Sequence, residues 1–219
     1  PARPSEIEYV ACALPDWEGA FNTSLRFKNL SFSMQWDGKV GGKTYSQSHH
    51  KMCEQGHLSE TLNGRKPGTS LYLDITDPDV LKLFEQQKIT PVAGVYCIAP
   101  GLVDNGDGTY SPNRKLVTLE SYYKEYYRIG NVETNTFSTT YLKLREVRLD
   151  YQLPKKWLKN TFISNASVGV YGRNLLCITS YPMFDPETTS LDGNTFVPGV
   201  EVGTLPTSRS WGVNLKVDF

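Results

Sequence analysis

Metal-binding side chains cluster once in the sequence, at His49, His50, Met52, Cys53 and His57. Imidazole nitrogens and thiolates are common zinc ligands, and zinc sites show them at short, recurring spacings. This cluster fits neither a Cys₂His₂ pattern nor the His-Glu-x-x-His helix motif. We therefore expect a loop or short helix with incidental histidines, and neither a bound metal nor another cofactor.

The run Asp104-Asn105-Gly106-Asp107-Gly108 holds a second pair of potential cation ligands. An EF-hand needs oxygen ligands at alternate positions and a glycine at the sixth, and Asp104 and Asp107 do not meet that pattern. Asn-Gly and Asp-Gly pairs are strong hairpin signals. The run predicts a tight turn.

Four tyrosines, Tyr122, Tyr123, Tyr126 and Tyr127, are candidate ligand-binding residues. They follow Thr118-Leu119-Glu120-Ser121, which has the pattern of a helix start. Aromatic rings stack on sugar rings or on peptide side chains, so the group is a candidate binding surface. The alternative is that these rings are the packing face of a loop helix.

Catalytic motifs are lacking in the sequence. It contains neither a Gly-x-Ser-x-Gly elbow nor a phosphate-binding loop, and Cys12, Cys53, Cys97 and Cys177 have no metal or redox spacing. We therefore expect a protein that is not an enzyme, with mostly free cysteines. Lysine plus arginine equals aspartate plus glutamate at 23 each, which argues against a nucleic-acid partner.

The elements that must position these residues are strands, because apolar and polar residues alternate along several segments. Phe21, Leu25 and Phe27 share one face, and after Lys28-Asn29 the alternation resumes from Leu30 to Trp36. Two runs separated by two polar residues predict a hairpin. The expected strands are 17–28, 30–40, 141–153, 166–176 and 208–219.

The strand expected at 141–153 changes parity. Val147, Leu149, Tyr151 and Leu153 share a face, whereas Leu142 and Leu144 fall on the other. Either a bulge near Arg145-Glu146 or a strand rising above a bilayer accounts for the change.

The connections between the expected strands are unequal. Lys28-Asn29 and 154–165 are short, with one helical turn expected after Pro154, whereas 41–140 and 177–207 are long. Within the first long loop, Asp77-Pro78 predicts a helix that runs to about Gln87. Short turns on one side and long loops on the other are typical of outer-membrane barrels.

No run approaches the 18 apolar residues that a membrane helix requires, whereas a barrel strand needs only about 9–11 residues. The chain begins at Pro1 without an initiator methionine, and we expect a fragment or a processed product.

The chain resembles the C-terminal barrel region of the SusC-like TonB-dependent transporters of Bacteroidetes outer membranes. The similarity is spread over motifs whose order and spacing together are specific. These are Pro15-Asp16-Trp17-Glu18-Gly19-Ala20-Phe21, Gly41-Gly42-Lys43-Thr44-Tyr45-Ser46, Leu62-Asn63-Gly64-Arg65, Tyr141-Leu142-Lys143-Leu144-Arg145-Glu146-Val147, Tyr151 to Leu158, Gly172-Arg173-Asn174-Leu175-Leu176 and Phe184-Asp185-Pro186-Glu187-Thr188.

The resemblance implies an all-β fold, in which this chain supplies the last five antiparallel strands of a 22-stranded transmembrane barrel. The implied partners are the rest of the barrel and its plug, TonB, a SusD-like lipoprotein, outer-membrane lipid, and an oligosaccharide or peptide cargo. Phe219 resembles the C-terminal signal read by the barrel-assembly machinery, and Arg173 is a candidate cargo contact in the lumen. The alternative is a secreted β-sandwich binding module, whose apolar alternation faces a protein core.

Overall fold

The computed structural model describes residues 9–187, 190–192 and 195–219. These residues form two compact units. We call residues 11–45 and 136–219 the sheet unit and residues 46–135 the loop unit. None of the described helices is long and apolar enough to cross a membrane.

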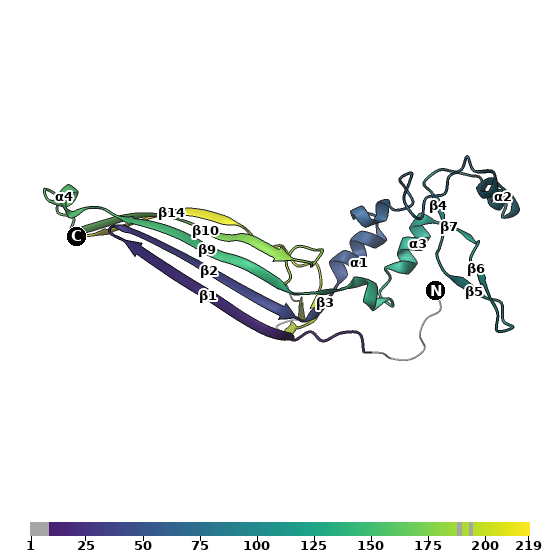
Figure 1. Ribbon diagram of the computed structural model, residues 1–219, viewed down its shortest axis with the longest axis horizontal. Coiled ribbons are helices and arrows are strands. Elements are labelled where there is room, and N and C mark those ends of the chain that lie inside the picture. The colour runs from purple at the N-terminus through teal and green to yellow at the C-terminus, as the bar shows by residue number, and fades with distance from the viewer. Residues whose placement is uncertain (1–8, 188–189, 193–194) are drawn as a thin grey trace. The chain divides into compact units, whose positions relative to one another are not determined.

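A five-stranded antiparallel sheet dominates the sheet unit, in the order β1-β2-β9-β10-β14 (Figure 1). Its strands are β1 (Pro15–Phe27), β2 (Leu30–Gly41), β9 (Tyr141–Gln152), β10 (Asn165–Thr179) and β14 (Ser210–Asp218). These bounds lie within three residues of the ranges expected from alternation. Among the described residues, β1 and β14 each pair with one neighbour only, so the sheet has two open edges.

Cross-strand partners divide the sheet into rows of one polarity. One row runs Leu25, Phe32, Leu149, Val170 and Val213 across all five strands. The adjacent row runs through polar side chains, because successive residues of a strand point to opposite faces. One face of the sheet is therefore apolar from edge to edge, and the other is polar.

The polar row next to the apolar row consists of Arg26, Ser31, Asp150, Gly169 and Asn214. The apolar face is not covered: Val213 and Leu215 are each 71% exposed. A β-sandwich would bury these side chains against a second sheet. Among the described residues, no second sheet buries Val213 and Leu215.

A bulge in β9 keeps the two faces distinct. Gln35 pairs with Glu146 and Trp36 with Leu144, so Arg145 has no partner in the register with β2. The extra residue brings Leu142 and Leu144 onto the same face as Val147 and Leu149. Of the two explanations for the parity change, the structure shows the bulge.

The two short connections lie at one end of the sheet, and the long ones lie at the other (Figure 1). The β1–β2 turn consists of Lys28 and Asn29, and the β9–β10 connection contains the one-turn helix α4 (Lys155–Leu158). The remaining short strands of this unit are β3 (Lys43–Ser46), β8 (Thr136–Ser138), β11 (Ser190–Asp192), β12 (Thr195–Val197) and β13 (Val200–Glu201).

The loop unit has a small core of its own, formed by Cys53, Leu71, Cys97, Leu119, Tyr123 and Tyr127. Its helices are α1 (Gln47–Glu54), η1 (Ser59–Leu62), α2 (Pro78–Gln86), α3 (Leu119–Tyr126) and η2 (Val132–Asn135). Its strands are β4 (Tyr96–Ile98), β5 (Leu102–Asp104), β6 (Tyr110–Pro112) and β7 (Leu116–Thr118). The expected helix starts after Asp77 and Thr118 are confirmed, as is the turn between β5 and β6.

Helix α2 begins where its cap residues predict. The Asp77 carboxylate accepts a hydrogen bond from the Asp79 amide at 2.9 Å, and Pro78 occupies the first turn. We expect Asp77→Ala to weaken this helix by about 1 kcal/mol, which corresponds to about fivefold faster amide hydrogen exchange across α2. Asp77→Asn keeps an acceptor and should exchange nearly as the wild type does. Equal exchange in the two variants would contradict the cap assignment.

Candidate functional site: the polar face and the tyrosine cavity

An ion-pair cluster occupies the polar face near the long-loop end of the sheet. Arg145 donates to both Asp37 carboxylate oxygens, at 2.5 and 2.8 Å. Lys143 donates to Asp185 at 2.6 Å, and both Lys143 and Arg145 also donate to Glu187. The cluster therefore joins β2 and β9 to the segment that follows β10.

The buried part of the cluster is charge-balanced, because it consists of one cation and one anion. These are the Lys143 and Asp185 side chains, which are only 4% and 2% exposed. Removing one partner of a buried pair strands the other charge in a poorly solvated site. Burial alone would raise the pKa of Glu187, but hydrogen bonds from Arg145, Lys143 and Tyr141 outweigh it and lower that pKa to about 2. The segment through Glu187 is thus anchored electrostatically to the sheet.

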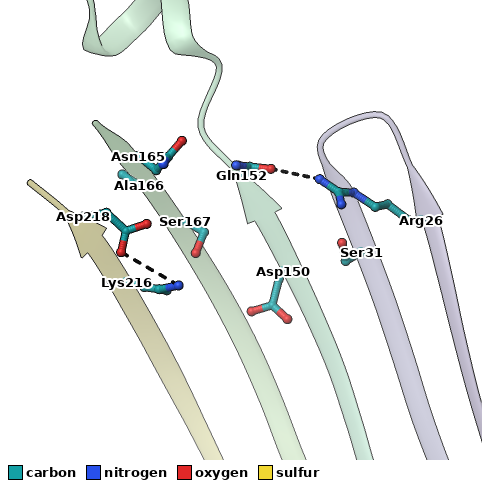
Figure 2. A pocket seen from close by; sticks show the side chains of 9 residues that line it. All are labelled: Arg26, Ser31, Asp150, Gln152, Asn165, Ala166, Ser167, Lys216 and Asp218. Carbon is teal, nitrogen blue, oxygen red and sulfur yellow. Dashed lines mark hydrogen bonds and ion pairs between the residues drawn. The ribbon is translucent and has the colours of Figure 1, made fainter. Parts of the chain in front are cut away.

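A second polar group lies at the short-turn end of the same face (Figure 2). It surrounds a cavity of about 280 Å³ whose lining residues come from β1, β2, β9, β10 and β14. Arg26 donates to Gln152 at 3.1 Å, and Lys216 lies 3.8 Å from Asp218. Because Arg26 and Lys216 are offset by Asp150 and Asp218, this site has no strong net charge to select an ion.

The four tyrosines of the loop unit divide into two pairs. Tyr123 and Tyr127 are buried in its core, whereas Tyr122 and Tyr126 line a largely apolar cavity of about 520 Å³. Leu102 and Val103 are among the other lining residues. The Tyr122 and Tyr126 rings stack with their centroids 5.6 Å apart. Packing thus accounts for one pair, and the other pair presents aromatic surface to a cavity.

Arg173 and Phe219 are the other two candidate residues, and their surroundings differ. Arg173 donates to Glu146 at 2.8 Å and lies over the Tyr171 ring. Phe219 is exposed, and its ring stacks on Phe162 with centroids 5.5 Å apart. Arg145 and Glu146 both pair with side chains of neighbouring strands, through Asp37 and Arg173.

Of the potential metal ligands between positions 49 and 57, the structure brings His49 and Cys53 together with Glu60, a residue that the sequence did not single out. His57 is exposed and lies outside this group. Burial raises the pKa of the Cys53 thiol to about 12, so this thiol is a poor nucleophile. All four cysteines are free.

The acidic run at 104–108 has a structural role. The Asp104 carboxylate accepts from the Gly106 amide, and the Asp107 carboxylate accepts from the Thr109 amide, each at 2.8 Å. These are the side-chain bonds that stabilise Asx turns. They confirm the turn that the sequence predicts.

Comparison with known proteins gives no matching family model. Two curated proteins of Formosa agariphila are similar across 94% of this chain: TonB-dependent receptor P3, at 23% identity, and TonB-dependent receptor P26, at 24% identity. This chain is similar in sequence to these TonB-dependent receptors. The resemblance to SusC-like TonB-dependent transporters is thereby confirmed. The chain spans only 16% and 17% of the length of these two relatives.

Solved structures agree on the fold. The chain resembles the RagAB peptide importer in its closed-closed state, with a TM-score of 0.55 and 17% identity over 94% of this chain and 18% of that one. The open-open state gives a TM-score of 0.50 at 16% identity, over 94% and 17%. The fold of this chain thus matches one segment of those solved structures.

The Glu187 anchor predicts a specific pH dependence. Because its pKa in the folded protein lies below the ordinary 4.5, its contribution is complete above about pH 4.5 and is lost as the pH falls towards 2. We expect pepsin cleavage at the exposed Phe184 to increase over that range, relative to cleavage elsewhere in the chain.

Glu187→Gln should make Phe184 susceptible at pH 4.5 already and remove most of the pH dependence. Glu125→Gln, which alters a surface ion pair with Arg128 at 3.0 Å, is the matched control and should leave the profile unchanged. The same profile in Glu187→Gln and in the wild type would rule out the anchor.

Proposed function

We propose that this chain is part of the barrel wall of a TonB-dependent importer in a bacterial outer membrane. The observation that supports this most strongly is the five-stranded sheet with one uncovered apolar face and one polar face. A barrel wall requires that division, since the outer surface contacts acyl chains and the inner surface contacts water. The relatives named TonB-dependent receptors point to the same function.

The open edges indicate the nearest partner. In hydrocarbon, each unpaired backbone N–H or C=O costs several kcal/mol, so a spanning sheet must close on itself. We propose that β1 and β14 pair with further strands of the same protein, to make a 22-stranded barrel. The short turns then lie on the periplasmic side and the long loops on the extracellular side.

For the complete importer we propose a plug, contact with TonB, and a SusD-like surface lipoprotein that covers the extracellular mouth. The cargo class is oligosaccharide or peptide, and the solved relatives are named as peptide importers. Phe219, exposed at the end of the apolar β14 face, is proposed as the signal for barrel assembly.

Two adjacent residues of β1 test the lipid-facing assignment. Phe21 lies near the middle of the strand on the apolar face, and Asn22 lies on the polar face. We expect Phe21→Arg to cost about 2–4 kcal/mol of barrel stability, because it places a charge in the hydrocarbon layer. The measurement is folded, surface-exposed protein in outer membranes.

Asn22→Arg is the matched control, because it introduces the same side chain one position away into water. It should leave the surface level nearly unchanged. Equal surface levels of the two variants, or a larger loss for Asn22→Arg, would overturn the membrane assignment.

The tyrosine cavity is the proposed contact for cargo or for the lipoprotein, through Tyr122 and Tyr126. An aromatic contact contributes about 0.5–1.5 kcal/mol, so Tyr126→Ala should weaken cargo uptake or lipoprotein capture by about 2- to 10-fold. Tyr110→Ala removes a more exposed ring that does not line this cavity and should have no effect. Indistinguishable cargo uptake and lipoprotein capture in the two variants would show that these tyrosines only pack within the loop unit.

A further inference from the structure

Three donor atoms of different chemistry meet in the loop unit. The His49 Nε2 atom lies 3.7 Å from Cys53 Sγ and 3.4 Å from Glu60 Oε1. One donor atom from each of the three residues lies within 4.8 Å of the others. We propose that these side chains form a binding site for a divalent metal ion of the zinc class.

The distances match tetrahedral coordination. Zinc binds imidazole nitrogen and carboxylate oxygen at about 2.0–2.2 Å and thiolate sulfur at about 2.3 Å. With tetrahedral angles, these bonds place N and S about 3.5 Å apart, and N and O about 3.4 Å apart. The observed separations are 3.7 and 3.4 Å, and all three donor atoms lie within 4.8 Å of one another, so an ion can reach all three after the Cys53 and Glu60 side chains move closer together.

The sequence builds this arrangement from two adjacent elements. His49 and Cys53 are four residues apart on α1, so their side chains lie on the same helix face. Glu60, in η1, approaches that face from the next turn of the chain. His49 and Cys53 are 1% and 0% exposed, whereas the Glu60 side chain is 47% exposed. The carboxylate side therefore gives an ion access from solvent.

Outer-shell hydrogen bonds orient the imidazole ring. Asn135 is fully buried, and its amide nitrogen donates to the Tyr127 carbonyl at 3.0 Å. The Asn135 carbonyl oxygen must then be the atom that accepts from His49 Nδ1, also at 3.0 Å. This places the proton on Nδ1 and leaves Nε2 as the imidazole donor, 3.4 Å from Glu60 Oε1, while Cys53 Sγ lies beside the ring at 3.7 Å from Nε2 and 3.9 Å from Nδ1. Metal-binding histidines typically donate their second N–H to a carbonyl or carboxylate in this way.

The carboxylate is oriented as well. The Tyr127 hydroxyl donates to Glu60 Oε2 at 2.9 Å, which leaves Oε1 directed at His49 Nε2. Glu60 and His49 thus each have one side-chain atom held by an outer hydrogen bond and one atom that faces the other residue.

Metal binding would replace the Cys53 S–H bond with a metal–sulfur bond and release that proton to solvent. The partly exposed Glu60 side would leave room for a further ligand from solvent. The proposal is independent of transport, because it concerns only residues of the loop unit.

The test uses the complete protein that carries this chain, purified in detergent, with Co²⁺ as the spectroscopic probe and Zn²⁺ as competitor. We expect saturable Co²⁺ binding with a near-ultraviolet thiolate-to-cobalt charge-transfer band, which Zn²⁺ abolishes. Cys53→Ser should remove this band, and His57→Ala and Cys177→Ser should retain it. No saturable band, or an undiminished band in Cys53→Ser, would overturn the proposal.

Two further variants keep the test valid if Cys53→Ser fails to fold. Glu60→Gln alters a partly exposed side chain and should weaken Zn²⁺ affinity by at least about 10-fold. Tyr127→Phe removes only a hydroxyl, which hydrogen-bonds both Glu60 and Cys53, and should weaken affinity by about 10-fold, within the range for outer-shell partners. Unchanged Zn²⁺ affinity in Glu60→Gln would show that the three residues hold one another by ordinary hydrogen bonds.

Discussion

The segregation of apolar and polar side chains onto the two faces of one sheet is the constraint on which the rest of the structure depends. At about 25 cal/mol per Å², an apolar face of this extent is strongly unfavourable in water. Side chains such as Val213, Leu215 and Trp211 remain exposed among the described residues. In the proposed barrel wall, this face contacts lipid and the open edges pair with additional strands.

Local irregularities preserve this segregation. A strand of 12 residues with strict alternation would place Leu142 and Leu144 on the polar face, and the unpaired Arg145 in β9 corrects the parity. The same residue then reaches Asp37 and Glu187 on the polar side. One inserted residue therefore both restores the apolar face and supplies a charge to the cluster that anchors the segment after β10.

Much of the fold follows from local sequence patterns. The five long strands, the turn at Lys28-Asn29 and the helix after Asp77 are each specified by periodicity or by cap and turn residues within a few positions, whereas periodicity shows the parity change in β9 without deciding that a bulge causes it. These features are predictable because their causes are short-range. The turn between β5 and β6 is likewise predictable from a short run of residues.

The candidate sites were harder to predict, because they join residues far apart in sequence. Asp185 and Glu187 contact Lys143 and Arg145 across about forty positions, which no periodic pattern encodes. The motif that contains Asp185 and Glu187 contributed to the family resemblance, but it carried no indication of this pairing. The sequence likewise does not indicate that Glu60 contacts His49, because this depends on the placement of η1 beside α1. Which tyrosines are buried and which line the cavity also depends on the packing of the loop unit.

The most direct test of the account is site-directed spin labelling along β14 of the complete protein in lipid bilayers, with one label at a time from Trp211 to Val217. Collision rates with oxygen, which concentrates in hydrocarbon, and with a water-soluble nickel chelate report the surroundings of each label. The account predicts alternation, with oxygen favoured at Trp211, Val213 and Leu215 and nickel favoured at Asn214 and Lys216. Uniform accessibility to the nickel chelate, or low accessibility to both reagents at Val213 and Leu215, would contradict it.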